Sequence, residues 1–166
     1  SRMSDKQQWL MPSPLGDILL ETDGIAITVV HFCDEPMTVT NAEHPLLLQA
    51  KSELEQYFAG ERQTFSFPMA QTGTDFQQRV WAMLTTIPCG KTISYKTLAI
   101  QLGDEKCIRA AGTANGKNQI AVSVPCHRVV GSSGELVGYA GGLWRKQWLL
   151  EHEAKMSGKA VQSSLF

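Results

Sequence analysis

Residues 120–134 read Ile-Ala-Val-Ser-Val-Pro-Cys-His-Arg-Val-Val-Gly-Ser-Ser-Gly. The first five positions are apolar except for Ser123, and the last four are glycine and serine, as in a loop. This pattern predicts a short buried strand that ends near Cys126, where a loop begins. The remaining elements can be placed outward from this strand end.

Cys126 is followed directly by a histidine and an arginine, and this neighbourhood has two interpretations. The thiolate is the reactive form of cysteine, and cationic or proton-accepting neighbours favour it by lowering the thiol pKa. A cysteine held at the end of a rigid strand would therefore be a well-placed nucleophile. Alternatively, Cys126 only fills space in the core, as free cysteines often do, and His127 and Arg128 are surface residues.

The overall composition is that of a globular protein. A chain of 166 residues suits one or two small domains with real cores. We expect no membrane partner and no secretion, because no apolar run approaches about 20 residues and no leader-like segment is evident. The four cysteines form no C-x-x-C pair, so we expect no metal, although His31 and Cys33 could ligate one from a strand face. Free thiols favour a reducing, intracellular compartment.

Charge is divided unevenly between the two halves of the chain. Residues 1–73 hold 4 Lys/Arg and 10 Asp/Glu, a balance of −6, whereas residues 79–146 hold 9 Lys/Arg and 3 Asp/Glu, a balance of +6. The asymmetry favours a second half that binds a polyanion and an acidic first half that faces away from it. Two ordinary surfaces would be the simpler explanation.

The first part of the chain, residues 1–70, reads as a small α/β domain. Residues 16–22 predict a strand, Asp23-Gly24 a hairpin turn, and residues 25–32 the return strand. Pro45 begins a helical pattern that runs to Ala59. Residues 63–67 predict one more strand. We expect this domain to be scaffold, because it contains no group of chemically reactive residues.

The second part, residues 74–166, predicts a mainly helical domain after a linker at 68–74. Thr74 and Ser94 are expected helix N-caps. The expected helices cover residues 74–87, 95–102, 106–117 and 143–153, with an extended piece at 135–139. Two of them, joined by a tight turn at Gly103, have the outline of a helix-turn-helix. The fold class is therefore α+β: a β-hairpin plus helix, followed by a helical domain that carries Cys126.

The expected helix at 106–117 is unusually smooth. It contains Arg109-Ala110-Ala111-Gly112 and a second glycine, and Arg109 is the only long side chain in this stretch. Such a surface allows close packing on a neighbouring helix, or equally close approach to a nucleic-acid backbone. A lone arginine is most often just a solvated charge.

Taken in order, these motifs resemble one family, the methylated-DNA–protein-cysteine methyltransferases, also called O6-alkylguanine-DNA alkyltransferases. The resemblance covers residues 74–153, and the acidic first half matches only in outline. It rests on Phe76–Trp81, Ile87–Gly90, Ser94-Tyr95, Arg109–Gly112, Asn118, Val124–Val130, Gly138–Leu143 and Trp148–Glu153.

The resemblance implies roles for five catalytic residues. Cys126 would accept the alkyl group from O6 of guanine, or from O4 of thymine, by in-line displacement, once per molecule. His127 would act as the base through a water, and Glu153 would stabilise the resulting imidazolium. Asn118 would brace the turn at the cysteine, and Tyr95 would donate a hydrogen bond or proton to the departing base.

The resemblance also implies how DNA is held. Val129, Tyr139 and Gly138 would line the pocket for the base. Arg109 would enter the base stack from the minor groove and replace a nucleotide that is flipped out. DNA contacts are expected from Arg109, Ala110, Ser94, Thr113 and Arg128. No cofactor is implied: the partner is double-stranded DNA with O6-alkylguanine, and the protein would act as a monomer in the cytoplasm or, in a eukaryote, the nucleus.

Two differences from related sequences matter. Many family members have proline after the bracing asparagine, whereas Gln119 follows Asn118 here, which leaves the loop conformation and the acceptance of large alkyl groups open. A related non-enzymatic subfamily has tryptophan in place of Cys126. Two alternatives remain: a module that only binds alkylated DNA, and a Cys-His hydrolase, in which adjacent Cys126 and His127 would point to opposite sides of a strand.

Overall fold

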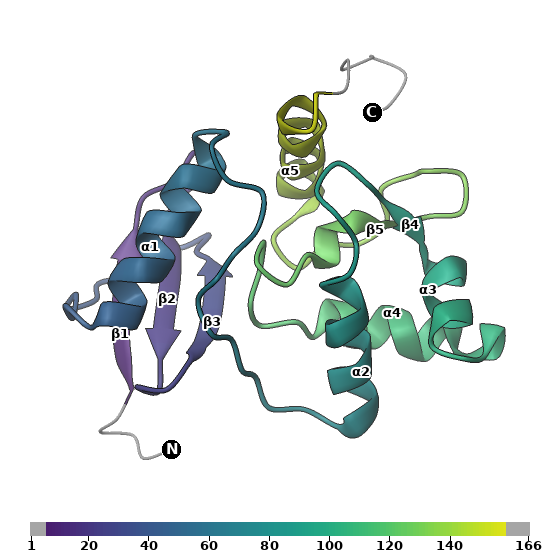
Figure 1. Cartoon of the computed structure of the whole chain (residues 1–166), viewed down its shortest axis with the longest axis horizontal. Helices are drawn as coiled ribbons and strands as arrows, with labels where there is room; N and C mark the ends of the chain where they lie inside the picture. Colours follow the sequence, from purple (N-terminus) through teal and green to yellow (C-terminus); the bar gives the residue numbers. More distant parts are fainter. Residues whose placement is uncertain (1–5, 159–166) are drawn as a thin grey trace. The chain divides into compact units, whose positions relative to one another are not determined.

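The computed structural model describes residues 6–158, which fall into two compact units (Figure 1). Within the described range, the first unit consists of residues 6–71 and a short return at 119–123, and the second of residues 72–118 and 124–158. The N- and C-terminal ends of the predicted domains, 1–5 and 159–166, lie outside the described residues. No helix within residues 6–158 has the length and apolar character needed to cross a membrane.

The first unit is a three-stranded antiparallel sheet with one helix packed on a face of it (Figure 1). Its strands, in the spatial order β1-β2-β3, are β1 (Gln7–Met11), β2 (Ile18–Thr22) and β3 (Ile27–Phe32). The predicted hairpin between β2 and β3 is present: the Asp23 carboxylate accepts from the backbone N–H groups of Ile25 (2.9 Å) and Ala26 (3.0 Å). Strand β1 was not predicted.

Helix α1 (Pro45–Phe58) follows the predicted range within one residue. Proline at its first position is preorganised for a helix, and His44 caps the end by accepting from the Leu46 N–H at 3.1 Å. The buried side of α1 carries Leu47, Ala50, Glu53, Leu54 and Tyr57.

The strand predicted at residues 63–67 is wrong. The backbone N–H of Ser66 donates to the Glu53 carboxylate at 2.7 Å instead of to a neighbouring strand. Phe65 packs against the rings of Tyr57 and Phe67, which places this segment over α1. Pairing with the sheet comes only afterwards, as an isolated bridge between Met69 and Ile27.

The buried strand predicted before Cys126 is also wrong. Only Ile120 pairs, in a parallel bridge with Val30 of the first unit. The chain then turns at Val122, a non-glycine residue with φ of +66°, and returns to the second unit. Cys126 therefore does not end a strand but begins a short 3₁₀ helix, Cys126–Arg128. A return turn at residues 121–124 takes the place of the predicted strand.

The second unit is mainly helical. Thr74 and Gln77 form a reciprocal capping box at the start of α2 (Asp75–Leu84), and Ser94 caps α3 (Tyr95–Gln101) by accepting from the Thr97 N–H at 3.0 Å. The helix predicted at 106–117 is α4 (Ile108–Gly116), preceded by a 3₁₀ turn, Glu105–Cys107. Helices α3 and α4 pack together after a turn at Gly103, whose φ is +110°.

Two details differ from expectation in the rest of this unit. A parallel pair of two-residue strands, β4 (Ile93–Ser94) with β5 (Val129–Val130), was not predicted. The extended piece predicted at 135–139 is a loop without strand pairing. Helix α5 (Leu143–Met156) begins as predicted and continues one turn beyond Glu153.

Candidate active site

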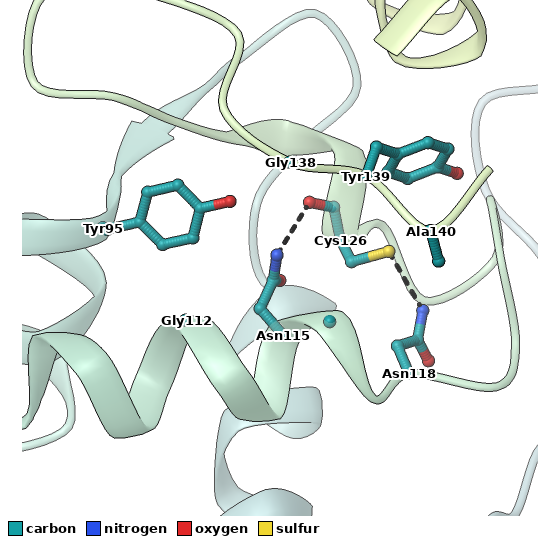
Figure 2. A pocket seen from close by; sticks show the side chains of 9 residues that line it. Tyr95, Gly112, Asn115, Asn118, Cys126, Gly138, Tyr139 and Ala140 are labelled. Carbon is teal, nitrogen blue, oxygen red and sulfur yellow. Dashed lines mark hydrogen bonds between the residues drawn. The ribbon is translucent and has the colours of Figure 1, made fainter. Parts of the chain in front are cut away.

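A cavity of about 160 Å³ lies in the second unit, between α4 and the loop before α5 (Figure 2). Its walls come from four parts of the sequence that the fold brings together: the start of α3, the C-terminal half of α4 with Asn118 just after it, Cys126, and the loop at 138–140. The lining residues are Tyr95, Gly112, Asn115, Gly116, Asn118, Cys126, Gly138, Tyr139 and Ala140. Cys126 is the one cysteine of the cavity wall.

Cys126 is held by hydrogen bonds on both its backbone and its sulfur. The Asn118 amide donates to the Val124 carbonyl at 2.8 Å and to the Cys126 Sγ at 3.3 Å, so the predicted bracing contact is present (Figure 2). Burial raises the pKa of the Cys126 thiol, although the Asn118 hydrogen bond and the Lys146 charge act in the opposite direction. The resting sulfur is therefore a thiol that needs a base to become reactive.

His127 and Glu153 form the predicted pair. Their side chains are fully buried, and His127 Nε2 lies 2.7 Å from Glu153 Oε2. Because a carboxylate can only accept, Nε2 carries the proton, and Nδ1 of the neutral ring is left with a lone pair. Nδ1 is buried and has no hydrogen-bond partner among residues 6–158. The ring thus has a basic nitrogen available.

Arg128 belongs to the same buried network, and the prediction that it contacts DNA is wrong. It is 5% exposed, and its guanidinium donates to Glu153 at 2.8 Å and 3.0 Å and to the Ile87 carbonyl. Burial alone would raise the pKa of Glu153, but His127 and Arg128 hold it well below the usual range. The carboxylate therefore stays ionised beside the histidine.

Tyr95 faces Cys126 across the cavity (Figure 2). Its hydroxyl donates to the Val137 carbonyl at 3.1 Å. Burial and the nearby Cys126 raise the pKa of this phenol, whereas the polar side chain of Asn115 lowers it. Tyr95 is thus a neutral hydrogen-bond donor at the cavity wall, as its predicted role requires.

Two residues of the site were missed by the sequence reasoning. Asn115, buried on α4, donates from its amide to the Cys126 carbonyl at 3.3 Å. Lys146, buried on α5, donates to the carbonyls of Val137 (3.0 Å) and Gly138 (3.1 Å), and burial lowers its pKa to about 8. Asn115 follows three small residues, and Lys146 stands next to Arg145. From the sequence alone, both positions are therefore expected to be exposed on the surface. The helical spacing of Lys146 from Leu149, Leu150 and Glu153 was the available signal.

The predicted base-pocket residues divide into two groups. Gly138 and Tyr139 line the cavity, whereas Val129 is fully buried in β5 and does not line it. The Tyr139 ring forms part of the wall, with its hydroxyl turned away from the Cys126 sulfur (Figure 2). Burial and the neighbouring Cys126 and Glu153 raise the pKa of this phenol well above its usual value.

The predicted DNA-binding residues other than Arg128 lie on α4 or at the start of α3. Arg109, Ala110 and Thr113 are exposed, while Ala111 and Ala114 of the same helix are buried. Trp81 of α2 anchors the buried side by donating from Nε1 to the Ala114 carbonyl at 2.9 Å. Ser94 is half-buried, and its hydroxyl is engaged in capping α3. One side of α4 is therefore exposed, the opposite side packs against α2, and the cavity is lined by Gly112, Asn115 and Gly116 of the same helix.

Two family models match this chain. The first, described as 6-O-methylguanine DNA methyltransferase, DNA binding domain, covers residues 75–155. The second, described as 6-O-methylguanine DNA methyltransferase, ribonuclease-like domain, covers residues 9–71. Together they span both structural units. The chain belongs to the 6-O-methylguanine DNA methyltransferase family.

Individual relatives agree with this assignment. A methylated-DNA–protein-cysteine methyltransferase of Mycobacterium leprae is 45% identical over 147 residues, 86% of this chain and 89% of the relative. The constitutive enzyme of that name from Bacillus subtilis is 44% identical over 137 residues, 78% of this chain and 83% of the relative. The solved structure of Mycobacterium tuberculosis OGT in complex with DNA superposes with a TM-score of 0.80 at 43% identity, covering 89% of this chain and 92% of that one.

Proposed function

We propose that this protein repairs alkylated DNA directly, by moving a methyl or larger alkyl group from O6 of guanine to its own Cys126. The observation that carries the proposal is the cavity, because it presents a single cysteine that is braced by Asn118 and followed by a buried His127–Glu153 pair. O4 of thymine is a second candidate substrate atom, since it carries an alkyl group in the same chemical setting.

The reaction starts with removal of the thiol proton. His127 takes this proton on Nδ1 through one bridging water, and Glu153 stabilises the imidazolium that forms. The thiolate then attacks the alkyl carbon in line with the carbon–oxygen bond. A carbon–sulfur bond forms while the carbon–oxygen bond breaks, and its electron pair leaves with the base. Tyr95 donates a hydrogen bond or a proton to the base as charge develops on it.

The product is a thioether on Cys126. A thioether has no acidic proton and is a poor leaving group, so the protein accepts one alkyl group and is then spent. No cofactor takes part in this scheme, because the damaged base is itself the alkyl donor.

The alkylated base must leave the duplex to reach the buried sulfur. We propose that the exposed side of α4, with Arg109, Ala110 and Thr113, lies in the minor groove and that Arg109 fills the space of the flipped nucleotide. The relatives named for methylated DNA and the relative solved with DNA support DNA as the partner. The protein would act as a monomer where it meets chromosomal DNA, in the cytoplasm or, in a eukaryote, in the nucleus.

A labelled-methyl assay tests the proposal. Duplex DNA with a radiolabelled methyl group on guanine O6 should transfer the label to protein until about one methyl is bound per chain. Cys126→Ala should accept none, whereas Cys33→Ala, at a half-buried cysteine in the first unit, should behave as wild type. Repeated turnover, or label on another residue, would defeat the proposal. Tight lesion binding without transfer would instead support a binding module.

A further inference from the structure

A hydrogen bond between Gln71 and Gln119 joins two distant parts of the sequence within the first unit. The backbone N–H of Gln119 donates to the side-chain Oε1 of Gln71 at 2.8 Å, across 48 positions of the chain. Gln119 directly follows Asn118, the residue whose amide braces Cys126. The reaction proposed above does not use either glutamine.

The edge of β3 brings these two residues together. Residues 68–70 pair with β3 at Ile27, and the return segment 119–121 pairs with it at Val30. Both segments run parallel to the strand, and the two pairing sites lie three residues apart. The chain that leaves Ile27 therefore advances along the edge toward Val30, and Gln71 arrives at the start of the return segment. Strand pairing thus fixes the place of this side chain.

The hydrogen bond acts on Asn118 through the peptide unit that Asn118 shares with Gln119. A peptide unit is planar, so the Gln119 N–H and the Asn118 carbonyl turn together. An acceptor for this N–H therefore fixes the backbone dihedral ψ of Asn118. On its other side, the Asn118 N–H donates to the Asn115 carbonyl at 3.4 Å. Helix α4 ends at Gly116, so these contacts hold Asn118 where the regular helix no longer does.

The backbone direction of Asn118 matters because its side chain reaches the reactive sulfur. The Asn118 amide nitrogen donates to the Val124 carbonyl at 2.8 Å and to the Cys126 Sγ at 3.3 Å. A rotation about ψ would carry this nitrogen away from the sulfur. The contact favours the thiolate, since a hydrogen bond to the charged form stabilises it.

The residue type at position 119 makes an outside anchor necessary. A proline would fix its own φ and restrict the residue before it, and it has no N–H that needs an acceptor. Glutamine brings neither restriction and leaves an N–H to be paired. Gln71 therefore supplies to Gln119 a constraint that a proline ring would supply by itself.

We propose that Gln71 is a positioning residue for alkyl transfer: it holds the peptide unit between Asn118 and Gln119, so that the Asn118 amide meets the Cys126 sulfur. The inference rests on the proposed function, in which Cys126 is the alkyl acceptor. It assigns to the first unit one specific contribution to the reaction, made through backbone geometry.

The first test removes the acceptor oxygen. Gln71→Leu should slow single-turnover transfer from a saturating O6-methylguanine duplex by about threefold to tenfold, the equivalent of one ordinary hydrogen bond. Its affinity for undamaged duplex should stay within about twofold of wild type, because the exposed side of α4 is unchanged. Gln71→Glu keeps an acceptor oxygen and should retain the wild-type rate. Equal losses in Gln71→Leu and Gln71→Glu would contradict the inference.

A backbone substitution at position 119 gives the sharpest comparison. Gln119→Pro removes the N–H, whereas Gln119→Ala keeps it and changes only an exposed side chain. Gln71→Leu should cost less than about twofold in the Gln119→Pro background, because its target is gone. In the Gln119→Ala background it should cost the full threefold to tenfold, as in the wild type. Equal costs in the two backgrounds would overturn the inference.

A measurement without DNA completes the test. Iodoacetamide modifies thiolates, so its rate of reaction with Cys126, followed by peptide mass spectrometry across pH, reports thiol ionisation. The Asn118 hydrogen bond lowers the pKa of this thiol, so Gln71→Leu should move the profile to higher pH. The same change should cause no further movement in Asn118→Ala. An unmoved profile in Gln71→Leu would contradict the inference, whereas a wild type that accepts no methyl group would defeat the proposed function instead.

Discussion

Each unit contains one buried glutamate with a lowered pKa, but the two carboxylates have very different hydrogen-bond partners. Glu53 of α1 is 5% exposed and binds Ser66, Gln49 and Arg62, all of which belong to the scaffold of the first unit. Glu153 of α5 is fully buried and binds Arg128 and His127. The pKa of each carboxyl is lowered by its partners against the opposing effect of burial.

The two networks differ in whether a partner of the carboxylate keeps a polar atom that makes no hydrogen bond. Ser66 uses both its N–H and its hydroxyl on Glu53, which fastens residues 63–67 to α1. His127 uses only Nε2, and its Nδ1 has no partner within residues 6–158. A buried carboxylate with a depressed pKa is therefore not by itself a sign of catalysis. The sign is a partner that still has a reactive atom to offer.

The largest effect should come from Glu153→Gln. Loss of the charge leaves the imidazolium unsupported, so single-turnover transfer should slow by about 100-fold or more. It also leaves buried Arg128 uncompensated, at a cost of about 3 kcal/mol or more in the free energy of unfolding. Urea unfolding and transfer kinetics on the folded variant measure the two losses. Wild-type kinetics in Glu153→Gln would rule out the proposed part of Glu153.

Glu53→Gln is the matched control in the other unit. It weakens hydrogen bonds to Ser66 and Gln49, so the free energy of unfolding should fall by about 1–2 kcal/mol. The rate of alkyl transfer should stay within about twofold of wild type, since Glu53 is not part of the cavity wall. A large loss of transfer activity in the folded variant would contradict the claim that Glu53 has only a structural role and that Glu153 supports the reaction.

The same pair predicts how stability depends on acid. The ordinary pKa of both carboxyls is 4.5, and folding lowers it. A depressed folded pKa adds stability that is fully present above the unfolded pKa and is lost as pH falls through the folded one. The difference in unfolding free energy between wild type and either Gln variant should thus be constant at neutral pH and shrink below about 4.5. Constant differences throughout the acid range would contradict the assigned networks.

The smallest predicted effect is the pH dependence that Lys146 gives to stability, and it falls in the alkaline range instead of the acid range. Burial lowers its pKa from 10.5 to about 8, so the folded state favours the neutral amine. A depressed lysine pKa makes stability rise with pH between those two values, because the unfolded chain binds the proton more tightly. The advantage of wild type over Lys146→Met should therefore grow from pH 8 to 10.5. A difference that is flat over this window would show that Lys146 is not buried as described.

Local sequence signals predicted much of the fold. Thr74 and Ser94 mark helix starts because their side chains accept from backbone N–H groups of the first turn, and Pro45 marks one because its ring presets φ and it has no N–H to leave unpaired. Asp23-Gly24 marks a turn for an equally local reason, since the Asp23 carboxylate accepts from the Ile25 N–H. The strands predicted at residues 63–67 and 120–124 were wrong because the partners of these segments are distant in the sequence. Glu53 takes the Ser66 N–H, and Val30 pairs with Ile120 alone before the chain turns back.

The site was predictable to a similar degree. The family resemblance located Cys126, His127, Glu153 and Asn118, and their mutual contacts are present in the structure. Arg128 was expected at the DNA surface because a charged residue is usually exposed. Asn115 and Lys146 were missed because polar and charged residues of a helix usually face solvent. Only the tertiary structure shows which of these groups meet a buried partner.

The most direct test of the central claim is mass spectrometry of the protein after one incubation with an O6-methylguanine duplex. We predict that wild type and Glu53→Gln each gain one methyl group, on the peptide that contains Cys126, and gain no more with excess DNA. Glu153→Gln should remain unmodified over the same interval. Methylation at another residue, or equal methylation of Glu153→Gln, would contradict the account.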